Sequence, residues 1–349
     1  MEQGRTQVTW TRCALAATLA FSCNSPGSER QDGPDAVPLP RLAPFVSVRS
    51  SDSLTFEVSD AALGPDRTTL VLDGNAHQVL RFDSLGRLQG RFGRRGSGPG
   101  ELQLAKDLEV GEDSVVAIAD VGNGRIGYWT MDGSWLGHFA PRRWVHDLAW
   151  THDGLYAKFV EKGGLRLQRI PRREQDPPNN GGLLSRGTMD TSGAEWTFGQ
   201  VDVVSPDRGL FAHPDSSYLA LEVDSLGRVT REFRRPDIRP VAYTSAERAA
   251  RETRFRSAAA TRPALRSLPM PVFKPMIADI AVDRAHRVWI LRHSQEGTEP
   301  PVDVFSSEGE YQGTLMIPAP ARRMEIQAEY LIAFGPDTTG ESVVTVFRY

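Results

Sequence analysis

Cysteine and long apolar runs are almost absent from this sequence. The 349 residues include two cysteines, Cys13 and Cys23, and both lie close to the N-terminus. A framework of disulfide bonds through the rest of the chain is therefore excluded. No run of about eighteen apolar residues occurs, so the sequence predicts no transmembrane helix.

A large excess of charge of one sign is also missing. Lys and Arg number 41 against 44 Asp and Glu, a formal net charge of -3. Such a balance gives no basis for binding a nucleic acid, and we expect no nucleic-acid partner. Apolar residues at 40% and charged residues at 24% fit a soluble globular body.

The sequence lacks the short motifs that usually carry catalysis. It has no His-x-x-x-His or paired-cysteine spacing, no Gly-x-Ser-x-Gly elbow and no phosphate loop. The glycine-rich run at 93–100 lies between two expected strands and not ahead of a helix, so we interpret it as turns. Enzymatic activity is therefore uncertain, a non-catalytic role is favoured, and no catalytic residue or metal ligand is assigned.

One pattern is written twice between residues 68 and 139. Each copy has an apolar run ending in an aspartate, then a Gly-Asn pair, an alternating run, a glycine turn and a third run. The two aspartates, Asp73 and Asp120, are 47 residues apart. A period of about 40 to 50 residues with several short strands is typical of a β-propeller blade.

Further strand-like runs predict an all-β fold, a six-bladed β-propeller over residues 43–349. The first two blades cover 56–92 and 104–139, and later ones begin near 145, 201, 277 and 330. The last blade is one strand short, and the strand-like run 44–48 has no blade of its own. We expect this run to complete the last blade, because closure removes open sheet edges. Seven blades would require splitting 171–196, which is the less favoured count.

An aspartate followed by alternating apolar residues opens the expected inner strand of five blades: Asp60, Asp107, Asp147, Asp202 and Asp279. We call these the marker aspartates, and we expect them at one mouth of the central channel. Crowded carboxylates raise one another's pKa or bind a cation such as Ca²⁺ or Mg²⁺. Alternatively, each accepts backbone N–H bonds from the entering loop. Repetition in blade after blade favours this structural role, because a ligand site is usually asymmetric.

His146 is the remaining candidate in this ring, as a general base or a metal ligand. Neighbouring residues on a strand point to opposite faces. His146 and Asp147 can therefore both face the channel only if the strand contains a bulge.

The run FGRRGSGPGE at 92–101 is followed by Asp120, Asn123, Arg125 and Ile126. Together they resemble the NHL-type repeat, and the chain is similar to six-bladed propeller lipoproteins of bacteria. Blades three and four lack the Asp-x-x-Asn-x-Arg run, which we expect to fix a turn. The resemblance implies a six-bladed propeller. It implies no single activity, because such propellers serve mostly as binding platforms and occasionally as lyases or hydrolases.

The N-terminus is typical of a bacterial export signal. Arg5 and Arg12 precede a short apolar stretch at 13–21. Residues 19–23 resemble a lipoprotein cleavage box, which would make Cys23 the acylated first residue. We expect a signal peptide at 1–22, a disordered tether at 23–42 and a lipid-anchored location in the bacterial cell envelope. The alternative is an ordinary signal peptide and a secreted protein.

A helical insertion is expected at 235–275, between blades four and five, with Ser245 as the helix cap. Residues 235–274 hold nine Lys or Arg against three Asp or Glu. The insertion could recognise an anionic ligand or lipid head groups. The competing interpretation is a solvated helix that covers the ring.

The favoured function is a membrane-anchored, monomeric scaffold whose protein or small-molecule ligand meets the face with the long insertions. The alternative is a propeller lyase, lactonase or esterase with a divalent cation such as Ca²⁺ in the channel. A third hypothesis is the sensor part of a transport or secretion system. A mixed His, Asn and Glu cluster would favour the enzyme, whereas the sequence shows aspartates.

Overall fold

The computed structural model describes residues 39–111, 113–141, 144–151, 154–161, 164–170, 201–205, 209–212, 217–223, 229–261 and 270–349. The expected signal peptide, Cys23 and most of the expected tether lie outside the described residues. The chain divides into two compact units, Met1–Val37 and Pro38–Tyr349, and everything described below belongs to the second. Within the described ranges, no helix is long and apolar enough to cross a bilayer.

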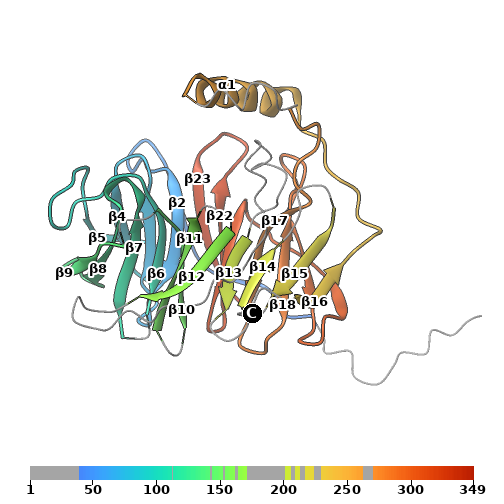
Figure 1. The fold of residues 1–349 in the computed structure, drawn as a ribbon, viewed down its shortest axis with the longest axis horizontal. Coiled ribbons are helices and arrows are strands. Elements are labelled where there is room, and N and C mark those ends of the chain that lie inside the picture. Colours follow the sequence, from blue (N-terminus) through green and yellow to red (C-terminus); the bar gives the residue numbers. More distant parts are fainter. Residues whose placement is uncertain are drawn as a thin grey trace, which may run out of the picture. The chain divides into compact units, whose positions relative to one another are not determined.

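The chain folds as a β-propeller, in which all the described antiparallel sheets but the last are built from consecutive strands (Figure 1). The first sheet has the order β2 (Val58–Leu63), β3 (Thr69–Asp73), β4 (Gln78–Phe82) and β5 (Leu88–Phe92). The second has the order β6 (Ala105–Val110), β7 (Val115–Asp120), β8 (Arg125–Thr130) and β9 (Trp135–Phe139), with the short 3-10 helix η1 (Val121–Asn123) between β7 and β8. These two sheets are the repeat predicted from the sequence.

The next three sheets follow the same rule. One contains β10 (Val145–Thr151), β11 (Gly154–Glu161) and β12 (Gly164–Ile170). Another contains β13 (Val201–Ser205), β14 (Gly209–Ala212), β15 (Leu219–Val223) and β16 (Val229–Arg234). The third contains β17 (Ile277–Val282), β18 (Val288–Arg292), β19 (Pro301–Phe305) and β20 (Tyr311–Met316).

The last sheet joins the two ends of the described chain. Its order is β1 (Ala43–Arg49), β23 (Ser342–Arg348), β22 (Tyr330–Pro336) and β21 (Arg323–Gln327). β1 pairs with β23 in antiparallel register, so the prediction that the run 44–48 completes the last blade is confirmed. β21 was not predicted, and it supplies the inner strand of this sheet.

The blade count differs from the prediction. The described residues contain five four-stranded sheets, where six were expected, and the sheet of β10, β11 and β12 has three strands. Residues 171–200, which follow β12, lie outside the described part of the chain. The inner strands nevertheless contact one another in a closed cycle, from β2 through β6, β10, β13, β17 and β21 back to β2.

Apolar side chains fill the space between neighbouring sheets. Between the last sheet and the first, Val71 and Phe82 pack with Ile332 and Val346. Each of these side chains is almost fully buried. Because strand residues alternate between faces, each sheet contributes one apolar face to each neighbour. This packing holds the inner strands close together.

The insertion contains one helix, α1 (Ser245–Thr261), between β16 and β17. Its cap is Thr244 and not Ser245: Thr244 Oγ1 accepts the N–H of Glu247, and Glu247 Oε2 accepts the N–H of Thr244. This reciprocal pair is a capping box, which satisfies two unpaired donors at the helix start. Lys274 Nζ lies 2.6 Å from Glu247 Oε1 and donates to the carbonyl of Ser294, which ties the helix to the sheet that follows.

Candidate functional site

Three marker aspartates join neighbouring inner strands. Asp60, Asp107 and Asp279 are each the third residue of their strand and are at most 6% exposed. The Oδ2 atoms of these residues accept a backbone N–H from the next inner strand, as follows: Asp60 from Leu108 at 2.7 Å, Asp107 from Leu148 at 2.6 Å, and Asp279 from Met324 at 2.8 Å. The structural role is supported for these three. The donor, however, is the next inner strand and not the entering loop.

A bulge before four of the five marker aspartates produces this geometry. The strand register shifts between Val58 and Asp60, and the same irregularity recurs before Asp107, Asp147 and Asp279. The extra residue re-aims the side chain that follows it. His146 is the extra residue in β10, so the bulge that the sequence argument required is present. The side chains of His146 and Asp202 lie outside the described part of the structure.

Asp147 has a different partner among the described contacts. Its Oδ2 lies 2.7 Å from Nζ of Lys158, on the adjacent strand β11. Lys158 is only 8% exposed. The pair is therefore a largely buried ion pair beside the aspartates of the first two sheets.

In the inner strand of the last sheet, an arginine stands at the position of a marker aspartate. The N–H of Met324 donates to a marker aspartate, as those of Leu108 and Leu148 do. Leu108 and Leu148 each follow an aspartate directly, so Arg323, just before Met324, stands where an aspartate would be expected. Its guanidinium lies among the aspartates, with Nη1 3.4 Å from Asp60 Oδ1 and Nη2 3.7 Å from Asp107 Oδ1. Nε lies 3.9 Å from Asp279 Oδ2. Arg323 therefore supplies a shared positive charge to three buried carboxylates.

Two glutamates break the symmetry of the ring. Glu109 and Glu325 each follow their marker position by two residues, and strand alternation places them on the same face as the marker residue. The equivalent residues of three other inner strands are alanines: Ala62, Ala149 and Ala281. Glu325 Oε1 lies 3.9 Å from Arg323 Nη2, and both side chains are partly exposed. The asymmetry expected of a ligand site is thus present, at positions that the sequence analysis did not single out.

Burial and like charges raise the pKa of these acids. Burial raises the pKa of Asp60 to about 7, with Arg323 opposing the shift and Glu325 adding to it. Burial, together with the charge on Asp60, raises the pKa of Asp107 well above its usual range. For Glu109 burial and Asp107 raise the pKa, and for Glu325 burial and Glu109 do so. Near neutral pH these acids can therefore hold protons, and an incoming cation would favour their ionisation.

The marker aspartates do not fit a Ca²⁺ site. Ca²⁺ takes about six to eight oxygen ligands. The Oδ2 atoms of Asp60, Asp107 and Asp279 already accept backbone N–H groups. Arg323 brings a positive charge to Asp60 Oδ1 and Asp107 Oδ1, and Asp279 Oδ1 accepts the N–H of Ile280. In the described ranges, no three His, Cys, Asp or Glu side chains converge in a way that could hold a metal ion.

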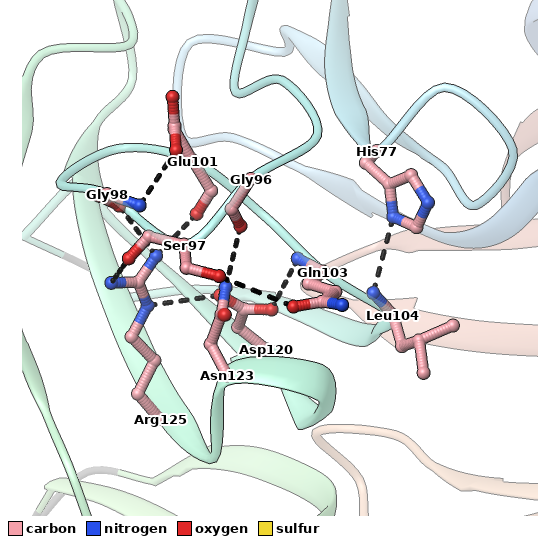
Figure 2. A network of polar contacts seen from close by, with 10 residues as sticks. All are labelled: His77, Gly96, Ser97, Gly98, Glu101, Gln103, Leu104, Asp120, Asn123 and Arg125. Atoms are coloured by element: carbon pink, nitrogen blue, oxygen red, sulfur yellow. Dashed lines mark hydrogen bonds and ion pairs between the residues drawn. The ribbon is translucent and has the colours of Figure 1, made fainter.

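The Asp-x-x-Asn-x-Arg run is structural, as predicted. Arg125 is 7% exposed and pairs with Asp120 Oδ2 at 3.0 Å, and Asn123 donates to the carbonyl of Gly96 at 2.9 Å. Figure 2 shows the guanidinium directed into the glycine-rich loop. There it donates to three carbonyl oxygens, those of Ser97, Gly98 and Glu101. The loop is therefore fixed by side chains of the next hairpin, and we assign it no ligand.

Extending the repeat by one unit would have found the missed residues. Residues 323–326 (RMEI) have the same types of residue as 107–110 (DLEV) at every position but the first. Both have an apolar second residue, a glutamate third and an apolar fourth. The substitution of arginine for the marker aspartate hid this match, and with it Arg323 and Glu325.

Comparisons with known proteins give the fold but no family. No family model matches the chain, and no curated protein matches it. The solved structure of U3-55K is 12% identical, with a TM-score of 0.52 over 87% of this chain and 98% of that one. A Bacteroides fragilis protein thought to be exported has 13% identity and a TM-score of 0.49, over 88% of this chain and 94% of that one. A Xanthomonas campestris gluconolactonase has 15% identity and a TM-score of 0.46, over 89% and 98%. At these identities a likeness concerns the fold alone. The chain is a β-propeller.

Proposed function

We propose that this chain is a six-bladed propeller that binds a cationic ligand where its inner strands meet. In this proposal the sheet of β10, β11 and β12 is the third blade. The closed cycle of contacts among the inner strands supports it. The ligand would carry an ammonium or guanidinium group, because carboxylates recognise such groups through charge-assisted hydrogen bonds.

The observation that carries this proposal is an excess of acids around the inner strands. We call this group the carboxyl cluster: Asp60, Asp107, Glu109, Asp147, Asp279 and Glu325. Its described cationic partners are Arg323 and Lys158, so the formal balance is six acids against two bases. A ligand cation that approaches the partly exposed glutamates would relieve this repulsion and release protons.

The test is calorimetric titration with small amines. Butylamine and putrescine should bind the wild-type protein with an affinity that increases from pH 5 to pH 8, because binding needs ionised carboxylates. Glu325→Gln and Glu109→Gln should each weaken binding by roughly tenfold, equivalent to about 1.4 kcal/mol. Glu310→Gln removes the same charge from an exposed turn and should leave the affinity unchanged. Equal affinities in all three variants, or no binding, would overturn the proposal.

The enzymatic alternative remains the metal-dependent lyase or lactonase type of hydrolase. No contact among the described residues favours it, since Arg323 lies among the aspartates that a cation would need. A titration with Ca²⁺ distinguishes the two. Stoichiometric binding that is lost in Asp107→Asn would support the metal-dependent alternative instead.

We also propose that the protein is anchored in the bacterial cell envelope through acylated Cys23. Two arginines before a short apolar stretch, followed by the cleavage box at 19–23, support this location. Metabolic labelling with a fatty-acid analogue should mark the wild-type chain and not a Cys23→Ala variant. A labelled variant, or an unlabelled wild type, would contradict lipid anchoring.

A further inference from the structure

Leu104 is an extra residue in the second blade. Glu57 in the first blade and Gln103 in the second make equivalent backbone bonds. The N–H of Glu57 donates to Asp73 Oδ1 and its carbonyl accepts the N–H of Gly74. In the same way, the N–H of Gln103 donates to Asp120 Oδ1 and its carbonyl accepts the N–H of Gly122. The marker Asp60 lies three residues after Glu57, whereas Asp107 lies four residues after Gln103. The additional residue, Leu104, stands between that shared anchor and the first residue of β6.

The extra leucine is held in an unfavourable state. Its φ of 53° lies in the left-handed region, which a leucine rarely adopts. Its side chain is also 54% exposed, so it gains little from burial. A non-glycine residue kept in strain without apolar packing is an observation that points to function.

A buried histidine supports this conformation. The N–H of Leu104 lies 3.2 Å from Nδ1 of His77, which is 3% exposed and has a positive φ of its own. His77 Nε2 in turn lies 3.1 Å from Nη2 of Arg95. Figure 2 shows the imidazole directed at the Leu104 backbone while the leucine side chain points away from the network. The leucine is therefore presented to solvent in a fixed position.

Trp144 occupies the same position in the next blade. It lies three residues before Asp147, as Leu104 lies three residues before Asp107, and it is 60% exposed. The strands that follow, β6 and β10, are neighbours joined by the bond from Leu148 N–H to Asp107. In the fifth sheet the residue three places before the marker aspartate is a buried Met276, and in the first sheet Leu104 has no counterpart, because Glu57 aligns with Gln103. Leu104 and Trp144 are therefore large exposed apolar residues just before two neighbouring inner strands.

We propose that Leu104 and Trp144 contact the hydrocarbon part of a ligand whose cationic group binds the carboxyl cluster. This inference rests on the proposed function and names its ligand class, an amine with an alkyl or aromatic body. Glu109 follows Leu104 by five residues along a bulged segment, so at about 3.3 Å per residue the two backbones are at most roughly 16 Å apart. An extended amphiphilic amine can span that distance, with its charge at the acids and its apolar end at the two residues.

The experiment compares butylamine with decylamine on the full chain. Each methylene buried against Leu104 or Trp144 should raise the affinity roughly fourfold, so decylamine should bind at least about tenfold more tightly than butylamine. Leu104→Gly and Trp144→Ala should each lower that ratio. Glycine accepts the positive φ, so Leu104→Gly should keep or raise the melting temperature, which separates loss of contact from loss of fold.

Leu136→Ala is the matched control, because Leu136 is also 54% exposed but lies on the outer strand β9. It should leave the ratio unchanged. If butylamine binds and decylamine binds no more tightly, this inference is overturned while the proposed function stands. If neither amine binds, the proposed function fails. A ratio that falls equally in Leu136→Ala would show adsorption to any exposed leucine and would also overturn the inference.

Discussion

The first two blades are near copies, and the positions at which they differ separate architecture from specificity. Both have a marker aspartate that accepts an N–H from the next inner strand, Asp60 in one and Asp107 in the other. Both have a second aspartate that accepts an N–H from the entering chain. The second blade alone has Glu109 and the extra Leu104. Shared residues therefore build the blade, and the unshared ones are the candidates for ligand recognition.

One unshared position has a purely structural explanation. In the first blade, Asp73 Oδ2 accepts from Gln78 Nε2 at 3.2 Å. At the equivalent position of the second blade, Arg125 pairs with Asp120 and also donates to carbonyls of the glycine-rich loop. No such loop precedes the first blade. The arginine is needed because the partly buried carbonyl groups of an irregular loop require donors.

The largest expected effect comes from removing the cation that the marker aspartates share. Arg323→Met should destabilise the protein by about 3 to 5 kcal/mol at pH 8, because Asp60 stays buried without a counter-charge. The loss should be smaller at pH 5, where the carboxyls hold protons. Urea unfolding at both pH values measures this. Arg322→Met, an exposed neighbour, should change stability by less than about 0.5 kcal/mol; similar losses in both variants would contradict the shared-cation role.

The second prediction compares the side chains that pair with Asp73 in the first blade and with Asp120 in the second. Arg125→Ala should cost about 3 kcal/mol, because it leaves the buried Asp120 charge unpaired. Gln78→Ala removes one neutral side chain from Asp73 and should cost about 1 kcal/mol. Denaturant unfolding of both variants gives the difference. Equal costs would mean that the glycine-rich loop does not depend on the arginine.

The third prediction concerns pH. Asp60, Asp107, Glu109 and Glu325 have raised pKa values in the folded protein, so the folded state binds more protons than the unfolded state between about pH 4 and 7. Stability should therefore fall as pH rises through this window, by roughly 1 to 3 kcal/mol.

Thermal unfolding from pH 4 to 8 measures this fall, and two variants sharpen it. Glu109→Gln should flatten the pH dependence, because it removes one of the acids. Ala62→Glu, which gives the first blade the glutamate of the second, should steepen it. A wild-type profile that rises with pH across the window would contradict the direction of these pKa shifts.

The smallest expected effect is that of the extra residue. Leu104→Gly should stabilise the protein by about 1 kcal/mol, because glycine adopts a positive φ without the steric cost that leucine bears. Inserting a leucine between Glu57 and Val58 of the first blade should destabilise it, since no histidine equivalent to His77 supports that site. The melting temperature should rise in Leu104→Gly and fall in the variant with the inserted leucine.

Much of the architecture could be predicted because the repeat makes it redundant. The aspartate spacing placed β2 to β9, and an orphan apolar run at 44–48 identified the strand that closes the last sheet. β21 was missed because Arg323 replaces the aspartate that announces every other inner strand. The cap of α1 was misplaced by one residue, because Thr244 and Ser245 are both good caps and only the reciprocal bond to Glu247 decides.

The candidate site was less predictable for a physical reason. Glu109 and Glu325 stand on strands with apolar neighbours, a pattern that usually indicates a solvent-facing residue on an alternating strand. Only the meeting of inner strands from different blades shows that they share one region with Arg323. The strain at Leu104 is invisible in the sequence, because an extra residue becomes apparent only when hydrogen bonds align the two blades.

The strand order of the last sheet also constrains how the protein is made. β23 lies between β1 and β22, so β1 has no partner until residues 342–348 have been synthesised. Arg49 and Val343, which face each other across the two strands, are 294 residues apart in sequence (343 − 49). Pairing over such a separation is slow, and a chain still being synthesised carries an unsatisfied strand at its start. Loss of β23 would expose the edges of β1 and β22 at once, so termination before residue 342 should yield aggregates and not a slightly shorter propeller.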